Sequence, residues 1–259
     1  MVDARTVVGE LRAALPNVLI AVDFDGTLAP LVPDPDTSRP VDGALAALRA
    51  LAGAGADVAV VTGRDARTVV RLGGLDEVPG IVVAGLYGIE TWHDGALDSP
   101  ETPPVIRELQ DRLPQLLAAH DADPDVWIED KRLSLVVHGR KTADPDAALA
   151  PLREPLLRLT EELGLELHPG RDVLELRLPG YDKAGALRRL AAGHRGVLYL
   201  GDDLGDLPAF AEIRRLRDAG RTAWSVGVMS SAVPDVVGAA DLDVDGPADA
   251  VALLRQLAG

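Results

Sequence analysis

The chain has 259 residues and a formal net charge of −15, with 41 acidic residues, 26 basic residues and no cysteine. The lack of cysteine excludes disulfides, zinc–thiolate sites and thiol nucleophiles. An acidic chain lacks the clustered cations that bind nucleic acid or an anionic membrane surface, so we expect neither partner. No apolar run approaches the roughly 20 residues of a membrane span and no secretory leader is evident, so we expect a globular cytoplasmic protein.

Apolar runs and helical periodicities alternate over the first 97 residues and again from residue 180 onward. Short β-branched runs predict strands buried on both faces, and the segments between them repeat apolar residues at helical spacing. This order is typical of a doubly wound, Rossmann-like parallel α/β sheet. The predicted strands are residues 18–22, 57–61, 81–84, 197–200, 223–228 and 241–244, and the predicted helices are residues 41–51, 66–72, 183–192, 210–218 and 248–257.

The pattern changes between residues 98 and 179. A Pro-rich linker at residues 99–104 is followed by a helix, two strands, a second helix and two more strands. This αββαββ order is typical of an antiparallel sheet with helices on one face. We therefore predict a core made of residues 1–97 and 180–259, into which residues 98–179 insert a second α+β domain. Within the first of these helices, Pro114 predicts a kink or a second helix start.

The strongest chemical motif is Asp23-Phe24-Asp25-Gly26-Thr27, which directly follows the first predicted strand. Residues at i and i+2 on an extended chain point the same way, so the carboxylates of Asp23 and Asp25 face one site and Phe24 faces away. Ligands of open α/β sheets bind at the carboxyl ends of the strands. Two neighbouring carboxylates there indicate a divalent cation, or a nucleophile beside a proton carrier.

Three further polar features lie where they can converge on this motif. Thr62 ends the second predicted strand, and Lys183 opens a helix, where an ammonium and free amides favour an anion. Asp202, Asp203 and Asp206 follow another predicted strand. Carboxylates at two strand ends, one hydroxyl and one ammonium suit a magnesium ion and a phosphate. Lys183 is also one of only three lysines in the chain.

These four motifs resemble those of haloacid-dehalogenase-type phosphatases, and the inserted domain resembles their larger cap. More narrowly, the chain resembles the trehalose-6-phosphate phosphatase family over nearly its whole length. The supporting stretches are residues 23–30, 85–90, 129–131 with Ser134, 138–140, 175–177 and 201–203 followed by Ala209 and Phe210. Tyr87 and Gly139 stand where this family often has His and Tyr, and residues 205–208 differ from its usual Thr-Asp-Glu-Asp.

The resemblance implies hydrolysis of trehalose 6-phosphate, the last step of trehalose biosynthesis, through an aspartyl-phosphate on Asp23. Asp25 would protonate the leaving sugar oxygen and then deprotonate the attacking water. Thr62 and Lys183 would neutralise charge on the transferring phosphoryl group. The implied cofactor is Mg²⁺, whose ligands would come from Asp23, Asp25, Asp202, Asp203 and Asp206.

The resemblance also implies that residues of the cap contact the sugar and that the cap closes over it. Glu129 and Lys131, two residues apart, are expected to hydrogen-bond sugar hydroxyls. The other residues expected to bind substrate are Arg64, Glu90, Arg140 and Glu175. A trehalose-phosphate synthase is the expected functional partner.

Two other functions are compatible with the same motifs. One is a phosphatase of this fold for another sugar phosphate, such as sucrose phosphate or mannosyl-phosphoglycerate, which the stretches of the inserted domain disfavour. The other is a catalytically silent sensor of sugar phosphates. Silent relatives usually lose an acid, whereas Asp23, Asp25, Lys183 and Asp202 are all present here.

Overall fold

The computed structural model describes residues 2–170, 172–229 and 238–259. It contains two compact units, residues 1–99 with 181–259, and residues 100–180. We call them the core unit and the inserted unit. The sequence analysis places the first boundary before residue 98, but Ala96–Asp98 forms an edge strand of the core sheet.

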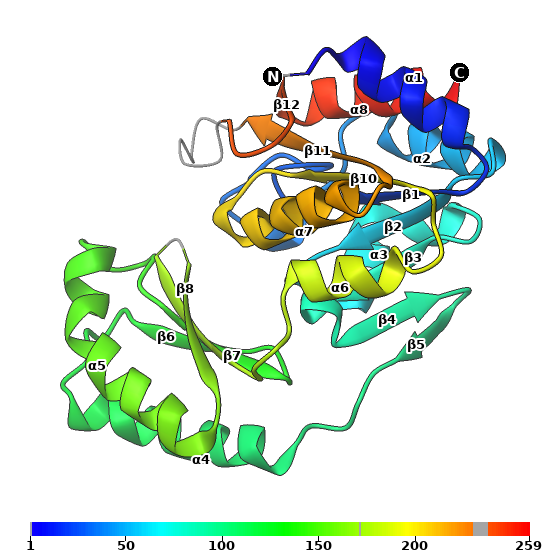
Figure 1. Cartoon of the computed structure of the whole chain (residues 1–259). Helices are drawn as coiled ribbons and strands as arrows, with labels where there is room; N and C mark the ends of the chain where they lie inside the picture. The colour runs from blue at the N-terminus through cyan, green and yellow to red at the C-terminus, as the bar shows by residue number, and fades with distance from the viewer. Residues whose placement is uncertain (1, 171, 230–237) are drawn as a thin grey trace. The chain divides into compact units, whose positions relative to one another are not determined.

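The core unit contains an eight-stranded sheet in the order β12-β11-β10-β1-β2-β3-β4-β5 (Figure 1). The first six strands in that order are parallel, and β4 and β5 are antiparallel. The strands are β1 (Val18–Val22), β2 (Asp57–Val61), β3 (Val82–Gly85), β4 (Glu90–His93), β5 (Ala96–Asp98), β10 (Gly196–Gly201), β11 (Thr222–Met229) and β12 (Leu242–Asp245).

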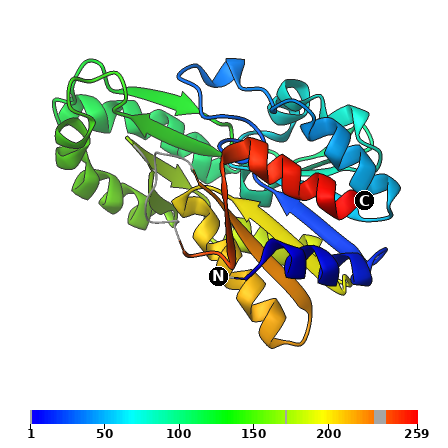
Figure 2. The same cartoon turned by 90° about the horizontal axis from the view of Figure 1, so that it is seen from above.

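Helices pack on both faces of this sheet (Figures 1 and 2). Ile20 and Val22 of β1 join a hydrophobic cluster with α1 (Ala4–Ala14), α2 (Ala44–Gly53), α3 (Ala66–Gly73) and α8 (Gly246–Ala258). Leu19 and Ala21 of the same strand join a second cluster with α6 (Lys183–Leu190) and α7 (Leu207–Asp218). Both faces of β1 are therefore buried, which explains its uninterrupted apolar sequence.

The sequence analysis did not predict α1 or the β4–β5 hairpin. Val7, Val8 and Leu11 have the spacing of an amphipathic helix, and Asp3 caps that helix by accepting a hydrogen bond from the backbone N–H of Arg5. The hairpin turns at Asp94-Gly95, where both residues have positive φ angles. Asp-Gly between two short strands favours such a turn, so the sequence contained a local signal for it.

The inserted unit is a four-stranded antiparallel sheet in the order β6-β7-β9-β8 with two helices. Leucines of the helices and alternate residues of the strands form its separate hydrophobic cluster, so one sheet face is apolar and the other is largely polar. Pro114 does not start a second helix, because α4 runs continuously from Pro104 to Ala119. The elements are α4 (Pro104–Ala119), β6 (Trp127–Asp130), β7 (Ser134–His138), α5 (Pro145–Leu163), β8 (Glu166–Gly170) and β9 (Val173–Arg177).

The strand order of the core sheet determines where a ligand can bind. The chain leaves β1 toward β2 and β3 on one side, and returns through β10, β11 and β12 on the other. Val22 pairs with Leu200, and the N–H of Asp23 donates to the Leu200 carbonyl at 2.9 Å. The carboxyl ends of β1 and β10 are thus adjacent at the point where the strand order reverses, which is the usual ligand site of such sheets.

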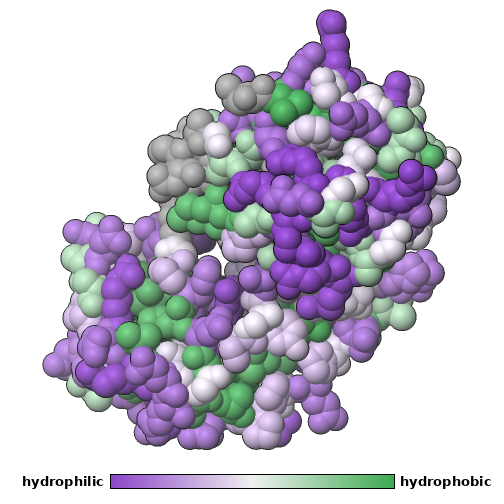
Figure 3. Space-filling model, in the orientation of Figure 1, coloured by the Kyte–Doolittle hydropathy of each residue, from purple (hydrophilic) through white to green (hydrophobic). Residues whose placement is uncertain are grey.

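The visible surface of the core unit is mostly hydrophilic. On its visible face, hydrophilic side chains prevail and hydrophobic ones form only small patches (Figure 3). Within residues 2–170, 172–229 and 238–259, no helix has the length and apolar character needed to cross a bilayer.

Candidate active site

Asp23 and Asp25 lie just beyond the carboxyl end of β1, and Phe24 between them is fully buried in the core. Gly26 turns the chain with a φ of +83°, and its N–H donates to the Ala29 carbonyl at 2.7 Å. A Cβ at this position would overlap the carboxylate of Asp202. Only glycine therefore allows the first motif and the end of β10 to approach this closely.

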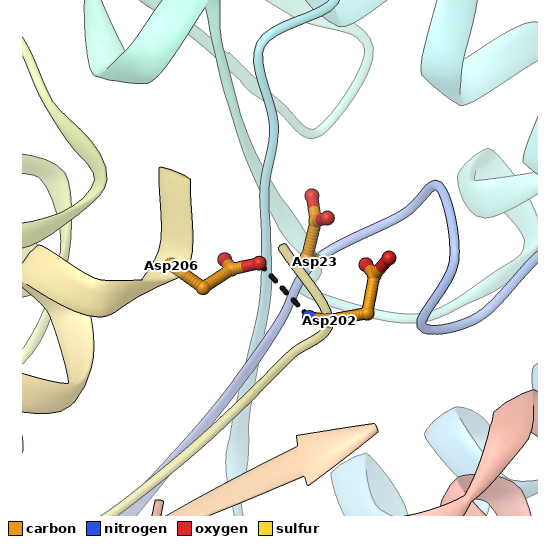
Figure 4. A group of neighbouring side chains, drawn as sticks. All are labelled: Asp23, Asp202 and Asp206. Atoms are coloured by element: carbon orange, nitrogen blue, oxygen red, sulfur yellow. Dashed lines mark hydrogen bonds between the residues drawn. The ribbon is translucent and has the colours of Figure 1, made fainter. Parts of the chain in front are cut away.

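Asp202 and Asp23 lie side by side in Figure 4, with their carboxylates pointing in the same direction. Thr27 donates its hydroxyl to Asp202 Oδ1 at 3.1 Å. Burial, aided by the nearby Asp206 and Asp203 charges, raises the pKa of Asp202 to about 8. Burial also raises the pKa of Asp23 well above its usual range, although Lys183 opposes the shift. Both groups therefore lie where additional positive charge would be strongly stabilising.

Lys183 provides the buried positive charge of the site. Its Nζ lies 2.7 Å from Asp206, 3.1 Å from Asp23 and 3.6 Å from Asp203. It is the first residue of α6, whose N-terminus is capped by Asp182 through the N–H of Gly185. Burial alone would lower the pKa of Lys183, but the charges of Asp206 and Asp23 outweigh it and hold the pKa well above its ordinary value. The ammonium is therefore charged at neutral pH.

Asp206 is predicted as a metal ligand from the sequence, but its carboxylate already accepts four hydrogen bonds. Oδ1 accepts from Lys183 Nζ at 2.7 Å and from the Tyr199 hydroxyl at 2.5 Å. Oδ2 accepts the backbone N–H of Asp202 at 2.9 Å (Figure 4) and that of Asp203 at 3.0 Å. A carboxylate offers about four lone-pair positions. We therefore assign Asp206 to the support of Lys183 and of the loop after β10.

Tyr199 is a member of the site that sequence reasoning missed. It lies in β10, is fully buried, and packs edge-to-face against Phe210 at a centroid distance of 6.0 Å. Its place in an apolar strand gave no sign that its hydroxyl meets Asp206. Asp203, also predicted as a metal ligand, has a side chain that is 53% exposed and contacts Lys183.

A divalent cation fits the donor set that remains. Asp23, Asp202 and Asp206 each offer a carboxylate oxygen within 4.8 Å of the others. Hydrogen bonds occupy Asp206, but Asp23 and Asp202 are buried acids with raised pKa values beside a single ammonium. Hard oxygen ligands of this kind suit Mg²⁺. The Asp25 carbonyl is the further ligand that the family resemblance implies.

Thr62 lies at the end of β2, nearly buried, and its Oγ1 accepts the N–H of Arg64 at 3.2 Å. Arg64 in turn reaches the predicted proton carrier. Its Nε and Nη2 donate to Asp25 Oδ2 at 2.5 Å and to Oδ1 at 2.7 Å. The structure therefore shows Arg64 hydrogen-bonded to Asp25. From the sequence, Arg64 was expected to contact the substrate.

Glu90 does not face an open site. Its side chain is buried, Oε2 accepts the N–H of Ala66 at 3.0 Å, and Oε1 accepts the Ser99 hydroxyl at 2.8 Å. We therefore assign Glu90 to the N-terminus of α3 instead of to the sugar. Tyr87, one of the family departures, lies against Gly63 and has a φ of 58°.

The inserted unit brings Glu129, Lys131 and Glu175 together on the polar side of its sheet. Glu129 pairs with Val136, which pairs with Glu175, so both acids lie on one face. Lys131 Nζ lies 3.7 Å from Glu175. His138 Nε2 lies 2.8 Å from Glu129, and this hydrogen bond, with the Lys131 charge, holds the pKa of Glu129 below its usual range.

Two of these residues are held in place by their neighbours. Glu175 Oε1 also accepts the Ser134 hydroxyl at 2.8 Å, and His138 stacks on Trp127 with a ring separation of 4.0 Å. Arg140, which follows β7, is exposed. The sheet face therefore offers charged groups on a rigid support.

Comparison with known proteins agrees with this arrangement. The family model described as trehalose-phosphatase matches residues 21–248. The chain belongs to the trehalose-phosphatase family. It is 39% identical over 211 residues to the trehalose-phosphate phosphatase of Mycobacterium avium, covering 74% of this chain and 50% of that protein. The chain spans about half the length of the curated mycobacterial trehalose-phosphate phosphatases it matches.

Solved structures show the same fold. The trehalose-6-phosphate phosphatase of Aspergillus fumigatus superposes with a TM-score of 0.72 at 25% identity, covering 99% of this chain and 97% of that one. The C-terminal domain of the Candida albicans trehalose-6-phosphate phosphatase gives a TM-score of 0.79 at 19% identity, covering 100% and 97%. The doubly wound core with an inserted α+β unit is therefore the fold of this family.

The hydrogen bond from Tyr199 to Asp206 leads to a stability prediction. Tyr199→Phe keeps the ring and removes only the buried hydroxyl. A hydrogen bond to a charged group contributes about 1.5–3 kcal/mol, so the free energy of unfolding should fall by about that amount. Urea denaturation measures it. Tyr181→Phe, at a partly exposed tyrosine, is the control, and an equal loss in both variants would contradict the assigned role of Tyr199.

Proposed function

We propose that this chain is a Mg²⁺-dependent phosphomonoesterase that hydrolyses trehalose 6-phosphate to trehalose and phosphate. The observation that carries the proposal is the buried contact of Lys183 with Asp23, beside Asp202, at the point where the strand order reverses. Family membership supports the substrate class. The mycobacterial relatives are named trehalose-phosphate phosphatases, which supports trehalose as the sugar.

Asp23 is the proposed nucleophile, because it directly follows β1, lies two residues from Asp25 and contacts Lys183. A bond forms between an Asp23 oxygen and phosphorus while the bond from phosphorus to the sugar oxygen breaks. Asp25 gives its proton to that leaving oxygen. In the second half, Asp25 takes a proton from water, the water oxygen attacks phosphorus, and the bond to Asp23 breaks.

The remaining groups stabilise charge. Lys183, held by Asp206, and the Thr62 hydroxyl face the phosphoryl oxygens in this proposal and neutralise their charge. Asp23 and Asp202 would hold Mg²⁺, and Asp203 contributes negative charge at the half-exposed edge. A bound Mg²⁺ supplies electrostatic stabilisation of the phosphoryl oxygens and fixes their orientation.

Recognition of the sugar is assigned to the inserted unit. Glu129, Lys131 and Glu175 offer two acceptors and one donor on one sheet face, and Arg140 adds an exposed cation. Sugar hydroxyls both donate and accept, so such a mixed set suits them. We also infer a cytoplasmic enzyme paired with a trehalose-phosphate synthase, because such a synthase would supply the proposed substrate.

The substrate is tested by phosphate release. We expect purified chain with Mg²⁺ to hydrolyse trehalose 6-phosphate in strong preference to sucrose 6-phosphate and glucose 6-phosphate. Asp23→Asn, nearly isosteric but unable to form the acyl-phosphate, should lose several powers of ten in rate and remain folded by circular dichroism. Equal rates on all sugar phosphates would remove the trehalose assignment. More than a tenth of wild-type activity in Asp23→Asn would remove the nucleophile assignment.

The metal is tested by binding and by activity. Calorimetry should detect Mg²⁺ binding to the wild type, and Asp202→Ala should weaken it at least tenfold, because one of two charged ligands is lost. The control is Asp218→Ala, at an exposed acid. Chelation should abolish phosphate release, Mg²⁺ should restore it, and Ca²⁺ should restore it poorly because its looser coordination misaligns the reacting groups. Full activity after exhaustive chelation contradicts the metal assignment.

The sugar contacts are tested by comparing two substrates. Glu129→Ala and Lys131→Ala should each lower kcat/KM for trehalose 6-phosphate by about tenfold to a hundredfold, since an unpaired buried sugar hydroxyl costs about 1–3 kcal/mol. Hydrolysis of p-nitrophenyl phosphate, which has no sugar, should change little. Equal relative losses of kcat/KM on both substrates would show that these residues stabilise the inserted unit and do not bind the sugar.

A further inference from the structure

Ser38 is a fully buried hydroxyl directed at the proposed proton carrier. Its relative exposure is 0%, and its Oγ donates to Asp25 Oδ1 at 3.1 Å. Neither the motifs nor the proposed function uses this residue. A buried hydroxyl without a partner is costly, so its position against Asp25 is energetically fixed.

The local backbone holds Ser38 in place. Asp34 caps the 3-10 helix Pro35–Thr37 by accepting the N–H of Asp36 at 3.1 Å, and the N–H of Ser38 donates to the Pro35 carbonyl at 3.3 Å. Pro35 at the first helical position restricts the turn further. Directly after Pro40 the chain is tied to the residue that follows the first motif, because Val41 N–H donates to the Leu28 carbonyl at 2.9 Å.

Arg64 joins this turn to the same carboxylate. Its Nη1 donates to the Pro35 carbonyl at 2.9 Å while its Nε and Nη2 contact both oxygens of Asp25. Asp25 therefore accepts three hydrogen bonds from two segments, two on Oδ1 and one on Oδ2. The turn, the guanidinium and the carboxylate form one connected group.

The Arg64 guanidinium and the Ser38 hydroxyl differ in whether they can stay bound to Asp25 during proton transfer. A guanidinium only donates, so Arg64 pairs with the carboxylate and has to leave Oδ2 free when that oxygen passes a proton to the substrate. A hydroxyl both donates and accepts, so Ser38 can keep its contact with Oδ1 whether or not Asp25 carries the proton.

We propose that Ser38 is a positioning residue for Asp25, whose hydroxyl fixes the carboxyl group through Oδ1 and leaves Oδ2 for proton transfer to the leaving oxygen. This inference rests on the proposed phosphatase function. If Ser38 positions Asp25, its loss should slow hydrolysis of substrates whose leaving group needs a proton and should not slow hydrolysis of substrates whose leaving group needs none. A sugar alkoxide needs the proton, and p-nitrophenolate, a stable anion, leaves without it.

The test compares Ser38→Ala with Thr37→Ala. Thr37 is the neighbouring exposed residue, and its hydroxyl donates to the Asp34 carbonyl at 2.7 Å, so its removal perturbs the same turn without touching Asp25. The measurement is kcat/KM for trehalose 6-phosphate and for p-nitrophenyl phosphate. This parameter covers substrate binding and the steps through departure of the leaving group, so it includes the step in which Asp25 acts as an acid and excludes the later attack by water, in which Asp25 acts as a base.

We expect Ser38→Ala to lower kcat/KM for the sugar phosphate about tenfold or more, within the 10²–10⁴-fold that acid–base catalysis supplies. For p-nitrophenyl phosphate, kcat/KM of Ser38→Ala should stay within about twofold of wild type, and Thr37→Ala should change neither value by more than about twofold. Ser38→Cys, with a weak donor of similar shape, should show a smaller loss of the same selectivity.

Failures of the two proposals are distinguishable. A wild-type chain that hydrolyses no sugar phosphate overturns the proposed function itself. An active wild type with Ser38→Ala indistinguishable from Thr37→Ala overturns the positioning role. Equal losses on both substrates in Ser38→Ala also overturn it, because a damaged turn has no leaving-group preference. If Ser38→Ala does not fold by circular dichroism, the same comparison is made with Ser38→Cys and decides in the same way.

Discussion

The arrangement of the core depends on one buried ammonium. Lys183 lies among three carboxylates from two segments, Asp23 after β1 and Asp203 and Asp206 after β10. Burying an uncompensated charge is expensive, and removing one partner of such a cluster leaves the others unpaired. The ammonium can be buried only because these carboxylates converge on it. They converge because parallel strands β1 and β10 end at the same sheet edge.

The same charge balance favours a further positive charge at the site. After Asp206 has accepted its four hydrogen bonds, Asp23 and Asp202 remain as neighbouring acids whose pKa values are raised. A cation lowers the cost of keeping both ionised, and a nucleophilic Asp23 must be ionised. Gly26 allows the two loops to approach closely enough for one cation to reach both carboxylates.

Much of this could be predicted from the sequence because its signals are local. Uninterrupted apolar runs identify the buried strands, and a carboxylate just after such a run has to lie at the sheet edge. The i, i+2 spacing correctly separates Asp23 from the buried Phe24. The contacts of Arg64 with Asp25 and of Glu90 with α3 join residues distant in the chain, and the contact of Tyr199 with Asp206 depends on how the loop after β10 folds back on its own strand. No periodicity encodes such contacts, so the sequence identified the residue types but not their partners.

The proposed role of Asp23 as the carrier of the phosphoryl group can be tested directly. Rapid acid quenching during turnover of trehalose 6-phosphate, followed by borohydride reduction, converts an aspartyl-phosphate to homoserine, which peptide mass spectrometry locates. We expect homoserine at Asp23, dependent on substrate and absent in a sample incubated without it. Homoserine at another aspartate, or active turnover with no reducible intermediate at any quench time, would show that Asp23 is not the nucleophile.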